Sequence, residues 1–137
     1  MIAFIIGAAL AVALSIFGKL TGYEKDRSFF STLLIVIASY YLLFAVLDGS
    51  VSTILIEIAV AAFFYLLAVW GGFRFPVIVG AGIALHGLFD FMYGYLYVNN
   101  GVPVWWPAFC AGIDIPFGLW VMFLKYKTIN SGLHDVA

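Results

Sequence analysis

The stretch "PVIVGAGIALHGLFDFMYGYLYV", residues 76–98, decides the fold of this chain. It contains no lysine or arginine, and its only histidine and carboxylate are His86 and Asp90. About 20 mostly apolar residues in a helix cross the roughly 30 Å hydrocarbon core of a bilayer. Pro76 suits the first turn of a helix, where a backbone amide hydrogen is not needed. We therefore expect a membrane-spanning helix over residues 76–98.

The composition extends this expectation to the whole chain. Of the 137 residues, 66% are hydrophobic and 9% are charged, whereas a soluble domain has roughly 25% charged residues. We expect an integral membrane protein with one domain over residues 1–137. The net charge of −1, without a basic stripe, indicates no nucleic-acid partner, and the single cysteine excludes a disulfide within the chain.

Four further apolar stretches have the length of a membrane span. The first has no lysine or arginine before it, so it is typical of a retained span and not of a cleaved signal peptide. Turn-forming or charged segments separate the stretches. The sequence predicts an all-α, polytopic protein with five transmembrane helices, at about residues 2–20, 28–47, 51–70, 76–98 and 104–124.

The basic residues predict the orientation of the five spans. All six of them fall in the connection between spans 1 and 2, in the connection between spans 3 and 4, or after span 5. Cytoplasmic loops carry the excess of lysine and arginine. We therefore expect the N-terminus outside and the C-terminus in the cytoplasm. The six residues are Lys19, Lys25, Arg27, Arg74, Lys125 and Lys127.

Four ionisable residues, Glu57, His86, Asp90 and Asp114, lie inside the predicted spans. Such residues are rare in membrane segments and are functional candidates by default. At 1.5 Å per helical residue they lie about 9 to 18 Å below the outer ends of their spans. Three helices thus place them at similar depth, which predicts one site. We expect its pocket to be lined by Tyr40, Tyr41, Tyr97 and Cys110.

The charges of this predicted site need a positive partner. No lysine or arginine lies in the outer half of the membrane in this topology, and a carboxylate in a low dielectric pairs or takes up a proton. The acids can be protonated, a protonated His86 can pair with one of them, or a cation can bind. A divalent metal held by His86 and the carboxylates of Glu57, Asp90 and Asp114 is one form of such a site.

Three classes of function remain open. An enzyme would use the same four residues as metal ligands or as general acids and bases on a lipid-like or small amphipathic substrate. A proton- or cation-coupled transporter or binding protein would need a homo-oligomer, because five short spans make a thin carrier. A structural subunit would use the polar groups as interhelical hydrogen bonds, worth about 0.6 to 2 kcal/mol each.

Two segments, "YEKDRSFFSTLLIVIASYYLLFAV" and "HGLFDF…NNGVPVWWPAFC…D", resemble a group of short bacterial integral membrane proteins without an established activity. The resemblance covers most of the chain and implies a bacterial cytoplasmic membrane. Relatives in that group carry histidines directly after "FDF", where this chain has Met92, Tyr93 and Gly94. A histidine-rich metal site is therefore less well supported in this chain than in those relatives.

Overall fold

The protein is a bundle of five long helices in the computed structural model, which describes residues 1–134. Each helix is long and apolar enough to cross a membrane, and no strand occurs in the described residues. The five-span, all-α prediction is confirmed. The helices are α1 (Ile2–Thr21), α2 (Arg27–Asp48), α3 (Val51–Arg74), α4 (Pro76–Leu96) and α5 (Trp106–His134), with a short 3-10 helix, η1 (Tyr23–Lys25), after α1.

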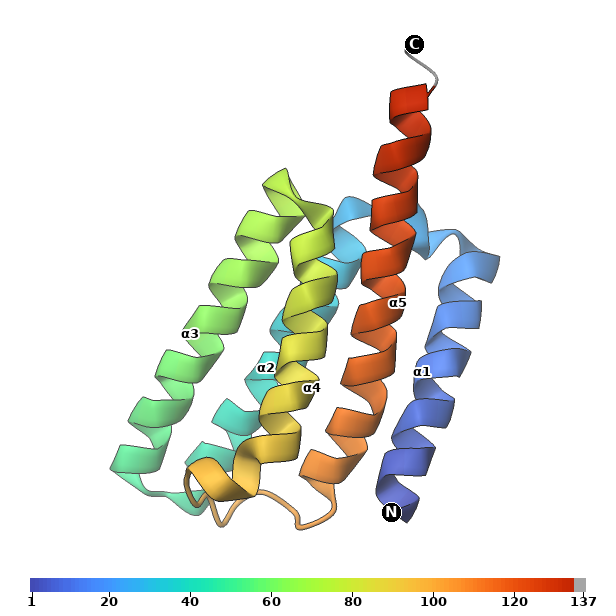
Figure 1. Ribbon diagram of the computed structural model, residues 1–137. Coiled ribbons are helices and arrows are strands. Elements are labelled where there is room, and N and C mark those ends of the chain that lie inside the picture. Colours follow the sequence, from blue (N-terminus) through green and yellow to red (C-terminus); the bar gives the residue numbers. More distant parts are fainter. Residues whose placement is uncertain (135–137) are drawn as a thin grey trace.

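Consecutive helices run in opposite directions (Figure 1). The C-terminal end of α5, the α1–α2 connection and the α3–α4 connection lie at one end of the bundle, which we call the basic end. The N-terminus and the α2–α3 and α4–α5 connections lie at the other, which we call the N-terminal end (Figure 1). Helix α5 packs against α1 and α4, and α3 packs against α2 and α4. Helix α4 also packs against α2, so it is in contact with α2, α3 and α5.

Local sequence signals explain where the helices begin and end. Gly22 and Gly49 follow α1 and α2 in the left-handed conformation, with φ of 77° and 75°, which glycine adopts without steric cost. The side chains of Asp26 and Ser50 accept hydrogen bonds from backbone amides in the first turns of α2 and α3. Pro76 is the first residue of α4, as the sequence predicts.

Three helices, α3, α4 and α5, have ends that differ by two residues or more from the sequence-based boundaries. Helix α3 continues through Gly71 and Gly72 to Arg74, beyond the expected end at residue 70. Helix α5 continues through Pro116 and beyond the expected end at residue 124 to His134. The extension begins with the polar "KYKT", which a hydropathy pattern does not register although the backbone stays helical. Helix α4 ends at Leu96, and Tyr97 is already extended, with φ of −166°. The α4–α5 connection is therefore longer than the sequence suggests.

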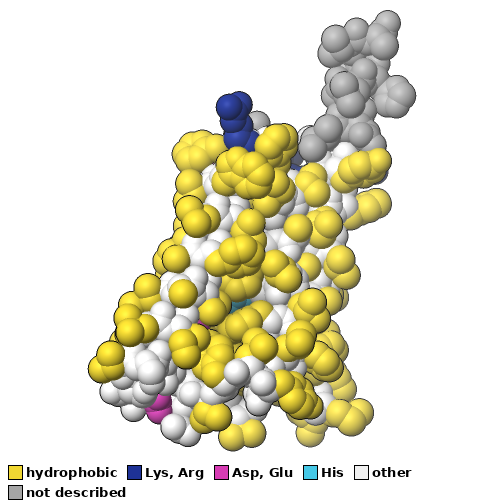
Figure 2. All heavy atoms as spheres, turned by 60° about the vertical axis from the view of Figure 1, so that its left-hand side comes forward, with side chains coloured by type: hydrophobic (Ala, Val, Ile, Leu, Met, Phe, Trp, Pro, Cys, Tyr) yellow, Lys and Arg dark blue, Asp and Glu magenta, His cyan; other side chains and the backbone are white. Residues whose placement is uncertain are grey.

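The outside of the bundle is apolar, and charge gathers at its ends. Figure 2 shows hydrophobic side chains over most of one face, with lysine or arginine atoms at the basic end and an acidic side chain at the opposite end. An apolar belt between two polar ends is the surface that a lipid bilayer requires. The surface therefore agrees with an integral membrane protein.

Glycines bring α4 and α5 together backbone to backbone. A Cβ atom on Gly87 would lie 2.8 Å from the backbone nitrogen of Ile115 and 2.9 Å from Cβ of Asp114. A Cβ atom on Gly118 would collide with the backbone nitrogen of Ala84. Small residues at helix contacts of this kind let backbones approach in membranes. The α4–α5 seam is the part of the fold that positions the candidate site.

Candidate functional site

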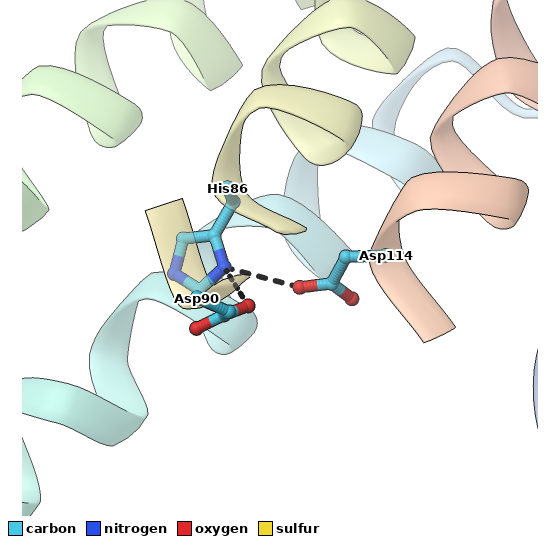
Figure 3. Close-up of side chains that lie close together, drawn as sticks. All are labelled: His86, Asp90 and Asp114. Carbon is cyan, nitrogen blue, oxygen red and sulfur yellow. Dashed lines mark hydrogen bonds and ion pairs between the residues drawn. The ribbon is translucent and has the colours of Figure 1, made fainter. Parts of the chain in front are cut away.

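Three ionisable side chains from α4 and α5 meet inside the bundle (Figure 3). Nδ1 of His86 lies 3.1 Å from Oδ2 of Asp90 and 3.0 Å from Oδ2 of Asp114. All three residues are buried, each with 1% of its surface exposed. We call these three residues the His86 cluster. It joins two helices through one imidazole nitrogen.

Helix geometry and a glycine explain why these three residues meet. His86 and Asp90 are four residues apart, so they share one face of α4. Gly87 faces Asp114 directly, because a Cβ atom at Gly87 would lie 2.9 Å from Cβ of Asp114. A larger residue there would hold α5 away from the imidazole. The expected His86–Asp90 face and the expected proximity of Asp114 are both seen in the structure.

Aromatic rings enclose the imidazole of His86. The ring centroid of Phe64 lies 4.8 Å from that of His86, and those of Tyr41 and Phe89 lie 5.9 Å away. These rings come from α2, α3 and α4. The surroundings of the cluster are thus of low polarity, which strengthens every charge interaction inside it.

The cluster carries more negative charge than its own groups can balance. A protonated imidazole beside two carboxylates leaves a net charge of −1, and all six lysines and arginines lie near the basic end: in the last turns of α1 and α3, in η1, at the start of α2, or in α5 beyond residue 124. Oδ1 of Asp90 is also buried without a hydrogen-bond partner in the described part of the chain. One further positive charge, or one divalent ion in place of the imidazole proton, makes the cluster neutral.

The arrangement suits a metal ion. One ligand atom from each of the three residues lies within 4.8 Å of the other two. Metal–ligand bonds of about 2.0 to 2.2 Å place neighbouring ligands about 3.0 Å apart at right angles and about 3.4 Å apart in a tetrahedron. The two distances from Nδ1, 3.0 and 3.1 Å, are close to the first value. His86, Asp90 and Asp114 can therefore hold a divalent cation with small side-chain adjustments.

Glu57, the fourth residue of the predicted site, lies apart from the cluster with partners of its own. Its Oε1 atom accepts hydrogen bonds from the Tyr93 hydroxyl at 2.9 Å and from Nδ2 of Asn99 at 3.2 Å. The sequence-based interpretation did not single out either partner. A signal for Tyr93 exists, because His86, Asp90, Tyr93 and Tyr97 are spaced four, three and four residues apart along one face of α4 and its end.

The predicted pocket-lining residues fall in different places. Tyr40 and Cys110 line a cavity of about 240 Å³ between α1, α2 and α5, and this cavity extends to Asp114. Tyr41 is buried against His86 and Tyr93. Tyr97 follows α4 and places its hydroxyl group inside the protein near Glu57. Tyr40 and Cys110 thus lie beside the His86 cluster, and Tyr97 lies beside Glu57.

A second hollow approaches the cluster from the opposite side. A groove of about 470 Å³ between α3 and α4 has only apolar walls, and these include Phe64 and Phe89, the rings that contact His86. Figure 2 shows histidine atoms deep in a hollow of the apolar surface. The cluster is therefore separated from the membrane side of the bundle by little more than a layer of rings.

Comparison with protein-family models, with curated proteins and with solved structures finds no match to this chain.

Proposed function

We propose that this integral membrane protein binds a divalent metal cation inside the bilayer, at the His86 cluster. The observation that carries the proposal is the contact of one buried imidazole nitrogen with two carboxylates from two helices. Nothing in that part of the bundle supplies a fixed positive charge, because the lysines and arginines lie in η1, in the helix ends at the basic end, or in α5 beyond residue 124. Buried charges of this kind pair, coordinate a metal or become protonated.

Two states of the cluster account for its geometry. Without metal, the hydrogen on Nδ1 is shared between Asp90 and Asp114, and a further proton on one carboxyl group removes the excess charge. With metal, the cation replaces the Nδ1 hydrogen, and a neutral imidazole and two carboxylates balance its two charges. Ligands of mixed nitrogen and oxygen type suit first-row divalent ions such as Mn²⁺, Co²⁺ and Zn²⁺.

The test measures metal-dependent stability in detergent micelles. Protein stripped with a chelator is titrated with Mn²⁺, Co²⁺ or Zn²⁺, and Tm is followed. A ligand at 100 times its Kd adds about 2.7 kcal/mol to the free energy of unfolding, so we expect a clear rise in Tm. The variants Asp114→Asn and His86→Gln should lose the rise.

Ser39→Ala is the matched control, because this part-buried hydroxyl bonds to the carbonyl of Ile35 and to Tyr65 on α3. It should keep the full response. Absence of any metal-dependent rise in the wild-type protein, together with no metal in elemental analysis, would reject the proposal.

The proposal includes a location. The basic end of the bundle carries the lysines and arginines, which favours a cytoplasmic basic end and an N-terminus outside. The resemblance described above favours a bacterial cytoplasmic membrane. The cluster then lies in the outer half of the membrane. A role in transport would also require a homo-oligomer, and size measurement of the detergent-purified protein tests that part.

A second candidate function is favoured by the cavity that extends to Asp114. Its walls are apolar apart from Asp114, Tyr40 and Cys110, and its volume of about 240 Å³ suits an acyl chain or a small amphipathic molecule. A metal beside this cavity could activate water against such a substrate. Hydrolysis would be detected by product analysis after the protein is incubated with metal and lipid extracts. Transport would instead be detected as uptake of metal into sealed proteoliposomes.

A further inference from the structure

We propose that Glu57 forms a second cation site, near the N-terminal end of the bundle, that takes a small monovalent cation such as Na⁺. The site is separate from the His86 cluster, and this proposal does not depend on divalent binding there. Glu57 is 1% exposed, and its carboxylate has a bonded oxygen and an open one.

The open atoms define the ligand position. Oε1 of Glu57 accepts both available hydrogen bonds, from Tyr93 and from Asn99. Oε2 is buried and has no partner among the described residues, and the same holds for the hydroxyl group of Tyr97. The hydroxyl of Tyr97 lies toward the carboxylate of Glu57, near enough for the two groups to interact directly, although they form no hydrogen bond of good geometry. Two oxygens from different segments are thus left for one ligand.

The chemistry of these atoms selects the class of cation. Carboxylate and hydroxyl oxygens are hard ligands, which favour alkali and alkaline-earth ions over softer transition metals. One carboxylate supplies one negative charge, so a monovalent cation makes the site neutral. A divalent cation would leave one uncompensated charge in a low dielectric, which is costly.

The α4–α5 connection is folded to hold this site together. Asn99 donates through Nδ2 to Glu57 and accepts through Oδ1 from the backbone amide of Gly101 at 3.1 Å. The next residue, Asn100, donates through its backbone and side-chain amides to Oδ1 of Asp48 at 3.3 and 3.0 Å. The connection is thereby tied to the end of α2, with Asn99 buried over Glu57.

Two aromatic rings separate the two sites. The Tyr93 ring, whose hydroxyl bonds to Glu57, packs on the Tyr41 ring with centroids 4.5 Å apart. Tyr41 in turn contacts His86. The polar groups beside Glu57 are the neutral side chains of Tyr93, Tyr97 and Asn99. None of the three can balance its charge.

The test compares Na⁺ with an organic cation. The wild-type protein in detergent at pH 8, with N-methylglucamine as the buffer cation and a chelator present, is titrated with NaCl or with choline chloride at constant ionic strength. We expect Tm to rise saturably with Na⁺ and not with choline. Glu57→Gln should remove this rise. Tyr97→Phe keeps the charge and should raise the Na⁺ concentration at half effect roughly fivefold, the worth of one polar contact.

The controls separate this proposal from the preceding one. Ser39→Ala should keep the Na⁺ response, and Asp114→Asn should keep it while losing the response to divalent ions. Equal Tm in Na⁺ and choline for the wild-type protein overturns the proposal. In that outcome, a Tm that depends on pH in the wild type but not in Glu57→Gln identifies Glu57 as a proton site. A Tm independent of both identifies it as a structural hydrogen-bond acceptor.

Discussion

At the residue scale, the buried carboxylates differ in how many donors surround them. Oδ2 of Asp90 and of Asp114 share a single imidazole nitrogen, whereas Oε1 of Glu57 has two neutral donors. A group with two donors should be sensitive to the loss of either one. This sensitivity can be tested at Tyr93, whose hydroxyl group donates the shorter of the two hydrogen bonds to Glu57.

Tyr93→Phe should destabilise the protein by roughly 1 to 3 kcal/mol, because it leaves a buried carboxylate oxygen with one donor fewer and keeps the ring packing. Tyr40→Phe is the matched control, since Tyr40 is 41% exposed and its change should stay within about 0.5 kcal/mol. Reversible unfolding with SDS in mixed micelles measures both free energies. Equal values for the two variants would mean that the Tyr93 hydroxyl bond contributes nothing to stability.

At the element scale, two glycines of α4 have opposite roles. A Cβ atom on Gly87 would meet the α5 backbone at Ile115, whereas one on Gly94 would meet nothing within 4 Å. Gly87→Ala should push α5 away from His86, cost about 1 to 3 kcal/mol and weaken divalent binding. Gly94→Ala should stabilise by up to about 1 kcal/mol, from helix propensity. Unfolding and metal titration of the two variants give the comparison.

A loss of stability in Gly87→Ala with unchanged metal affinity would show that the α4–α5 seam does not position the His86 cluster. Gly94→Ala should leave metal affinity as it is in the wild type.

The start of α2 provides a prediction about pH. Oδ1 of Asp26 accepts from the backbone amide and the hydroxyl of Ser28, both at 2.8 Å, and these bonds hold the pKa of Asp26 below its usual value. The stabilisation from a lowered pKa is complete above the ordinary aspartate pKa of about 3.9 and is lost as pH falls through the lowered value. Asp26→Ala should therefore have a lower Tm than the wild type at pH 6.

The difference in Tm between the wild type and Asp26→Ala should shrink as pH falls below about 4, where the wild-type carboxylate becomes protonated. Thermal unfolding of both proteins across this pH range measures the difference. A gap that stays constant down to pH 2 would show that the cap acts without its charge.

At the scale of the whole molecule, apolar run length alone predicted five helices, and their number and most of their ends agree with the structure. Hydropathy measures how unfavourable it is to expose a segment to water, so it locates membrane spans well. It misses the final turns of α5, because a helix that leaves the membrane becomes polar without changing its backbone. The polar start of that extension, at Lys125, shows the effect.

The site could be predicted only in part, for a related reason. Depth and a spacing of four residues brought His86, Asp90 and Asp114 together correctly. Depth does not determine how a helix is rotated about its axis or which neighbour a side chain faces. The sequence therefore did not predict that Glu57 on α3 would bond to Tyr93 and Asn99 and lie apart from the His86 cluster. Asn99 lies in a connection, where the sequence indicates only a turn and gives no sign that the chain folds back over a buried carboxylate.

The bundle as a whole also predicts which end faces the cytoplasm. Cys110 is the only cysteine, so Cys110→Ala provides a background for single cysteines. Lys25 is exposed at the basic end, and Val104 is 99% exposed in the α4–α5 connection. In that background, Val104→Cys should react with a membrane-impermeant maleimide in intact cells, and Lys25→Cys only after lysis. The physical reason is the excess of basic residues retained on the cytoplasmic side.

Labelling of Lys25→Cys in intact cells, with Val104→Cys protected, would reverse the orientation. The N-terminal end of the bundle would then face the cytoplasm. The His86 cluster would lie in the inner half of the membrane, because Asp90 and Asp114 are nearer to that end of the bundle than to the basic end. Both sites would face the cytoplasm, and cytoplasmic metal and sodium concentrations would decide their occupancy. Equal labelling of both positions in intact cells would instead show two orientations in one population, for which neither side of the membrane is the sole source of the cation.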